Sequence, residues 1–204
     1  MELEFPKRYH PVHVSLHWLI ALGIFTNLYL GIFVFTQRGR GVFQFQTLHM
    51  AVGITILVLL LARMVMRFTI KRPADATAGH KALDILAKVV HYGLYLSVLA
   101  VTVLGLVFSL QTNRLQSAFT GSRPEFNGSS GGFNGPPPGF TPPAPGTFPN
   151  GRGGGFGFGS PLLIIHRLVA YLVALLVGIH ILAALYHQLI RRDNLLARMW
   201  YGSR

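Results

Sequence analysis

Three histidines interrupt an otherwise apolar stretch of membrane length near the C-terminus, and this feature constrains the fold most. The stretch runs from Pro161 to Arg192, and the histidines are His166, His180 and His187. In an α-helix, the fourteen residues from His166 to His180 rise by about 21 Å and complete nearly a whole number of turns. Both rings therefore leave one helix face at different depths, and His187 lies two turns further along it. Imidazole is a common metal ligand, and polar groups at membrane depth are usually functional, so we predict a membrane helix that carries metal ligands.

The composition of the chain also indicates a membrane protein. Of the 204 residues, 51% are hydrophobic and only 12% are charged, which is unusual for a soluble domain. The absence of cysteine excludes disulfides, iron–sulfur clusters, c-type haem attachment and thiolate zinc sites. The net charge of +12 would also fit a nucleic-acid-binding protein. We predict no nucleic-acid partner, because the basic residues cluster at the ends of apolar segments, as membrane topology requires.

Four segments are apolar enough and long enough to cross a bilayer, which takes about 20 residues. They cover approximately residues 12–35, 45–68, 89–110 and 161–190. We therefore predict an all-α membrane protein, with residues 1–204 forming a single domain built on a four-transmembrane-helix bundle. No cleavable signal peptide is predicted, because the first apolar run is too long and contains His17.

The distribution of lysine and arginine predicts the orientation of the bundle. With the N-terminus inside the cell, twelve of these residues flank the inner ends of the spans and six flank the outer ends. The positive-inside rule then places both termini in the cytoplasm.

The connection between the third and fourth spans, residues 112–160, has a different composition. Residues 121–160 hold thirteen of the 23 glycines and eight of the 12 prolines. Such a segment buries too little apolar surface to offset the entropy lost on ordering it. We predict a disordered, low-complexity periplasmic loop, which is either a passive insertion or a segment whose phenylalanines dock on a partner or on the bilayer surface.

Histidines on three of the spans can be paired by depth. His17 and His180 lie toward the inner surface, and His49 and His166 lie near the outer surface. Two imidazole pairs about 21 Å apart are the arrangement expected for two stacked b-type haems. Helix bundles build cofactor sites from facing side chains, and imidazole suits iron. His187 remains an alternative to His180 as the inner ligand.

Glycines at helical spacing fit the same interpretation. Gly31 follows His17 by fourteen residues, and Gly105 follows His91 by the same number. A flat macrocycle needs small residues where it lies against a helix, and Gly53, one turn after His49, is a further candidate. Glycines in membrane helices also serve helix packing alone, so this alternative stays open.

Polar residues near the inner surface are candidates for a second ligand shell or a quinone site. Arg63, fourteen residues after His49, is expected to pair with a haem propionate or to snorkel to the inner surface. His91 and Tyr95 begin the third span and are expected beside a bound quinone. The remaining histidines, His10, His13 and His80, are expected to be solvated.

Three segments resemble the bacterial cytochrome b561 family. They are LHWL around His17, TLHMAVGITILVLLLARMVMR from Thr47 and GIHILAALYHQLIRRDNLLARM from Gly178. The resemblance covers all four spans and implies a dihaem cytochrome of the bacterial inner membrane. The ligand pairs that it implies are His17 with His180 and His49 with His166. It also implies electron exchange with ubiquinone and, in some members, oxidation of superoxide. The long glycine- and proline-rich loop departs from the family pattern.

The expected function is therefore transmembrane electron transfer through two haem b groups, to or from ubiquinone. Two histidines per iron leave no open position for oxygen. The outer loops carry six arginines and one acid, Glu125, which would attract an anion such as superoxide, although the chain is basic throughout. The expected partners are membrane lipid, quinone, and superoxide or a periplasmic redox protein, and the expected enzyme class is a superoxide:quinone oxidoreductase.

Two other functions fit parts of the pattern. The chain could serve as the non-catalytic cytochrome b membrane subunit of a dehydrogenase or hydrogenase complex. A metal or proton transporter is disfavoured, because no Asp or Glu lies inside any predicted span.

Overall fold

The computed structural model of the chain describes residues 9–36, 42–70, 81–120, 160–192 and 199–200. The helices are α1 Pro11–Thr36, α2 Val42–Thr69, α3 Lys81–Gln111, α4 Arg114–Thr120 and α5 Pro161–Leu185, and α5 continues into a π-helix, η1, Tyr186–Arg191. No strand occurs in these residues, so the prediction of an all-α protein is confirmed.

Four helical segments are long and apolar enough to cross a membrane: Pro11–Ile32, Gln44–Thr69, Lys81–Gln111 and Pro161–Arg191. The prediction of four spans is therefore confirmed by length and composition. The third helix begins eight residues before the predicted span, because hydropathy marks only its apolar part. Its first turns are KALDILAK, which are mostly good helix formers, and Asp84 suits the positive end of the helix dipole.

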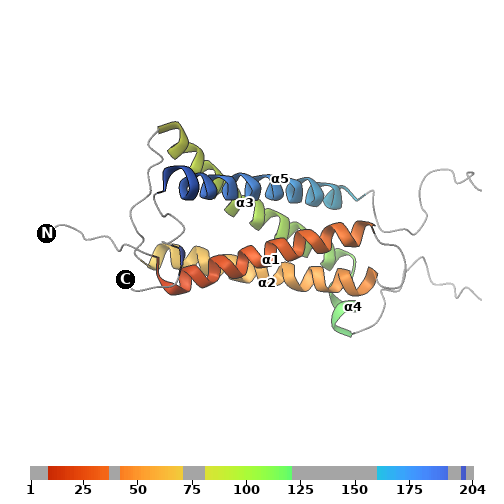
Figure 1. The fold of residues 1–204 in the computed structure, drawn as a ribbon. Helices are drawn as coiled ribbons and strands as arrows, with labels where there is room; N and C mark the ends of the chain where they lie inside the picture. The colour runs from red at the N-terminus through yellow and green to blue at the C-terminus, as the bar shows by residue number, and fades with distance from the viewer. Residues whose placement is uncertain (1–8, 37–41, 71–80, 121–159, 193–198, 201–204) are drawn as a thin grey trace, which may run out of the picture.

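The four long helices form two antiparallel pairs. α1 packs along α2, α3 packs along α5, and α2 also contacts α3 (Figure 1). The start of α1 and the end of α5 lie at one end of the bundle, and α4 lies at the opposite end (Figure 1). We call these the inner end and the outer end, following the predicted orientation.

The core is small, and most large apolar side chains face outward. Ile56 and Leu60 on α2 pack with Val98 on α3 and Val173 on α5. α1 approaches α2 closely at Gly23, where an added Cβ would lie only 2.9 Å from Cγ1 of Ile56. Small residues at helix contacts and apolar outer faces are what a lipid environment favours, because lipid gives no hydrophobic drive to bury them.

The C-terminal end of the chain contacts the inner end of α1. The indole N–H of Trp18 donates to the backbone oxygen of Met199 at 3.0 Å. The rings of Trp18 and Trp200 meet edge to face, with centroids 6.2 Å apart. These contacts tie the chain after η1 to the helix that carries His17.

The prediction that residues 112–160 form only a loop is wrong for its first part. The segment RLQSAFT forms α4, Arg114–Thr120, because it contains no glycine or proline. Asn113 turns the chain from α3 into α4 with a positive φ of 52°, a conformation that Asn tolerates better than most residues. The predicted disorder of residues 121–159 lies outside the described residues.

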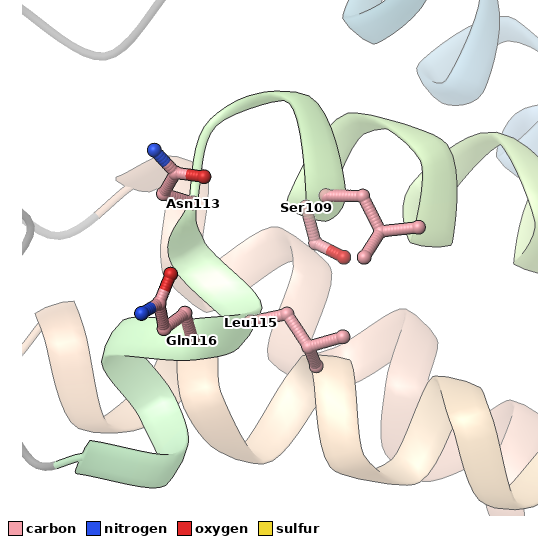
Figure 2. A pocket seen from close by; sticks show the side chains of 5 residues that line it. Ser109, Asn113, Leu115 and Gln116 are labelled. Atoms are coloured by element: carbon pink, nitrogen blue, oxygen red, sulfur yellow. The ribbon is translucent and has the colours of Figure 1, made fainter.

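A shallow hollow of about 250 Å³ lies at this turn (Figure 2). It is lined by Ser109, Leu110, Asn113, Leu115 and Gln116. None of these side chains is charged or is a metal ligand, so the hollow is not part of the histidine sites.

Candidate functional site

The outer pair consists of His49 on α2 and His166 on α5. Their ring centroids are 6.2 Å apart, and the ring planes make an angle of 70°. Each ring also interacts with a backbone group of the neighbouring helix, that of Asn27 on α1 for His49 and that of Val101 on α3 for His166. The Nδ1 atom of each ring is buried, so both rings are held inside the bundle.

Each ring of the outer pair lies against a glycine on its neighbouring helix. A Cβ added to Gly31 on α1 would lie 3.4 Å from Cε1 of His49. A Cβ added to Gly105 on α3 would lie 3.1 Å from Cε1 of His166. A methyl group at Gly105 would therefore crowd the ring of His166, whereas one at Gly31 would only just touch the ring of His49.

The inner pair consists of His17 on α1 and His180 on α5. Its geometry repeats that of the outer pair, with ring centroids 6.2 Å apart and an angle of 70° between the planes. The ring of His187 instead contacts Tyr186 in its own turn, at 6.0 Å. The structure thus brings His180, and not His187, opposite His17.

The separation within each pair fits two imidazoles bound on opposite sides of one metal ion. A metal–nitrogen bond of about 2.0 Å, with about 1.1 Å from that nitrogen to the ring centre, places two such centroids about 6 Å apart. No group of three or more His, Cys, Asp or Glu in the described residues is arranged to hold a metal. Two opposed imidazoles without further ligands suit the iron of a b-type haem, so the residues present fit that group.

Arg63 on α2 connects three helices at the inner end. Its Nη1 donates to the backbone oxygen of His13 on α1 at 2.7 Å, and its Nε donates to the hydroxyl of Tyr95 on α3 at 3.1 Å. One turn further, Arg67 donates to the hydroxyl of Tyr92 at 3.4 Å. Arg63 is therefore held inside the bundle in this structure and does not simply extend toward solvent.

His91 on α3 lies beside the inner pair. Its ring centroid is 5.0 Å from that of His180, and the two planes are nearly perpendicular, at 89°. Its Nδ1 lies 2.7 Å from the backbone oxygen of Ala87. The sequence-predicted residues His17, His180, Arg63, His91 and Tyr95 are thus gathered at one end of the bundle.

The expectation that His13 is solvated is wrong. Its side chain is only 4% exposed, because the first turn of α1 already faces the bundle and its backbone is bound by Arg63. The one-turn spacing between His13 and His17 was a signal for a shared, inward face. His10 is half-buried, and its Nδ1 accepts from the N–H of Val12 at 3.3 Å. His80 lies outside the described residues.

Asn27 on α1 was missed by the sequence reasoning. Its Oδ1 is buried without a hydrogen-bond partner among the described residues, and its Nδ2 would lie 3.4 Å from a Cβ added to Gly53. Gly53 therefore faces this amide and not a histidine ring. A lone amide inside an apolar span was the available signal.

Comparison with known proteins agrees with this arrangement. The family model described as prokaryotic cytochrome b561 matches residues 8–202 of the chain. The chain belongs to the prokaryotic cytochrome b561 family. This membership confirms the resemblance seen in the sequence, implies b-type haem, and identifies a multi-pass bacterial membrane protein of electron transport.

Similarity to one known protein extends along nearly the whole chain. The probable superoxide oxidase CybB of Yersinia pestis is 24% identical over 200 residues, which cover 95% of this chain and 96% of the relative.

Proposed function

We propose that this cytochrome b561 carries electrons across the membrane by means of two haem b groups. His49 and His166 would hold one, and His17 and His180 would hold the other. The observation that supports this most is the equal geometry of the two pairs, both 6.2 Å between centroids and 70° between planes. When bound, each haem supplies a one-electron carrier, and paired histidines leave no open coordination position for oxygen.

The spacing of the pairs suits transfer from one membrane surface to the other. His166 and His180 on α5 are separated by about 21 Å along the helix axis, within a hydrocarbon core of about 30 Å. One pair therefore lies toward each surface. The orientation with both termini in the cytoplasm remains part of the proposal.

Haem content tests this function directly. We expect the purified protein to contain two non-covalent haem b groups per chain, with low-spin bis-histidine spectra, by pyridine haemochrome assay. His49→Ala and His180→Ala should each remove one haem, whereas His187→Ala should keep both. Absence of haem would refute the cytochrome assignment, and a loss of haem in His187→Ala alone would reverse the choice of inner ligand.

We further propose that ubiquinone exchanges electrons at the inner end, near Arg63, Tyr95 and His91. Among the described residues, Arg63 donates one N–H of Nη1 and its Nε–H to protein groups, so its other guanidinium N–H groups are the proposed donors to the quinone. A positively charged donor stabilises the negative charge that develops on a quinone oxygen as it is reduced. The Arg63–Tyr95 hydrogen bond fixes the position of this donor.

The proposed electron donor at the outer end is superoxide. Two superoxide anions would give up two electrons and leave as oxygen, and one ubiquinone would take up these electrons with two protons to form ubiquinol. The name of the Yersinia pestis relative, probable superoxide oxidase, supports this donor, and the similarity covers 96% of that relative. Arg114 and Arg167 are the outer-end arginines within the described residues, and they add the positive charge that attracts an anion.

A further inference from the structure

The two helix pairs are built alike. In the sequence, His91 follows His17 by 74 residues, and Gly105 follows Gly31 by the same number. α1 and α3 therefore carry a histidine and a glycine at equivalent positions. Between α2 and α5, a shift of 117 residues superimposes His49 on His166, since 166 − 49 is 117. The same shift superimposes Arg63 on His180. The contact between glycine and imidazole occurs in both pairs, so the correspondence holds in space as well as in sequence.

At the inner end the two helix pairs differ in the residue beside the histidine of the inner site. Within α1 and α2, Arg63 binds the backbone oxygen of His13, one turn before His17. Within α3 and α5, the ring of His91 contacts the ring of His180. The pair of α1 and α2 thus contributes a cation at the inner end, and the pair of α3 and α5 contributes a second imidazole there.

The hydrogen bond of His91 fixes which of its nitrogens can accept. A backbone oxygen can only accept, so the proton of this bond lies on Nδ1 of His91, which donates to Ala87 at 2.7 Å. In the neutral ring, Nε2 then carries the lone pair. A histidine that binds a metal through one nitrogen keeps an N–H on the other, and this N–H normally finds an acceptor that orients the ring and raises its basicity.

We propose that His91 is the positioning residue for His180: its Nε2 accepts the ring N–H of His180 and so orients this ligand of the inner haem. The perpendicular contact at 5.0 Å brings the two rings together. The distance is shorter than the 6.2 Å between His17 and His180, so His91 lies beside His180 and does not take the place of its opposing ligand. This inference rests on the proposed binding of haem by His17 and His180.

The test compares His91→Leu, which removes the acceptor, with His91→Gln, whose side-chain oxygen can replace it. Redox titration of each purified protein should show two haems, with a raised midpoint potential for one haem in His91→Leu, because the acceptor stabilises the more positive oxidised iron. We expect about a tenfold change in the ratio of oxidised to reduced haem, which is about 59 mV for one electron. His91→Gln should restore at least half of this change.

His187→Leu is the matched control, because His187 is at the same end of the bundle and its ring contacts Tyr186. It should leave both potentials unchanged. The haem that shifts should be the one that is absent from His180→Ala. The proposal would be overturned by unchanged potentials in His91→Leu or by equal shifts of both haems in that variant. It would also be overturned by no recovery in His91→Gln, or by loss of the inner haem from both variants. A wild-type protein without haem, or a His180→Ala protein with two haems, would instead overturn the proposed function.

Discussion

At the scale of single residues, the space beside each imidazole decides whether a ring can keep its place. Gly31 and Gly105 both lie against a histidine of the outer pair, but the clearance differs by 0.3 Å between 3.4 Å and 3.1 Å. Gly178, on the same helix as both α5 histidines, has nothing within 4 Å of an added Cβ. At these three positions the distance from an added methyl group to its nearest neighbour increases from Gly105 to Gly31 to Gly178.

We expect Gly105→Ala to weaken haem binding at the outer site most, Gly31→Ala to weaken it less, and Gly178→Ala to leave it unchanged. Overpacking a tight contact costs about 1–3 kcal/mol, and here the atom that must move belongs to the ligand His166. All three substitutions raise helix propensity equally, so propensity cancels in the comparison. The rate of haem transfer from each protein to an apo-globin measures the effect. Equal rates in all three would show that the glycines serve only helix packing.

At the scale of elements, Arg63 links the helices of the inner end. Its two hydrogen bonds join α2 to α1 and to α3. Arg67, one turn away, has weaker links: a bond of 3.4 Å to Tyr92 and contacts over the rings of Tyr92 and Tyr95. Arg63 therefore has the central position at the inner end, and Arg67 has a peripheral one.

We expect Arg63→Gln to slow quinone reduction at least tenfold while both haems are retained. The variant loses the charge that stabilises the developing anion, which is the larger part of such an interaction. Arg67→Gln is the matched control and should slow the reaction far less. Stopped-flow oxidation of the reduced protein by a soluble ubiquinone analogue measures both rates. Unchanged kinetics in Arg63→Gln would place the quinone elsewhere, and loss of haem would give Arg63 a structural role.

At the scale of the whole molecule, the sequence predicted the spans and the depths of the histidines but not how the helices pair. Hydropathy and the fourteen-residue spacing are local properties of one segment, and they follow from helix geometry alone. The packing of α1 on α2 and of α3 on α5 depends on contacts between distant segments, such as Gly23 with Ile56. The neighbour of Gly53 and the contact of His91 with His180 follow from that packing, so no local pattern could give them. The π-helix after Leu185 likewise has no signal in a smooth apolar run.

The outer loop belongs to the same scale, because it joins the two helices of one pair, running from α4, which follows α3, to α5. Replacing residues 121–159 with a short Gly/Ser linker should leave both haems and the thermal stability almost unchanged. No histidine lies between His91 and His166, and each doubling of loop length costs only about 0.6 kcal/mol. Haem content and reduction by superoxide and by an artificial donor should be compared with the full-length protein, and only the superoxide rate should fall. Loss of the outer haem would instead make the loop a lid over His49 and His166.

Both histidine pairs include a residue of α5: His166 in one and His180 in the other. This helix is the last of the four to leave the ribosome. On the proposed ligation, a nascent chain that has inserted α1, α2 and α3 possesses neither complete site, so cofactor loading must follow translation and cannot guide the insertion of the earlier helices. Both sites then become complete in a single event, the docking of α5. A cell short of haem would therefore accumulate fully inserted apoprotein and not partly made chains.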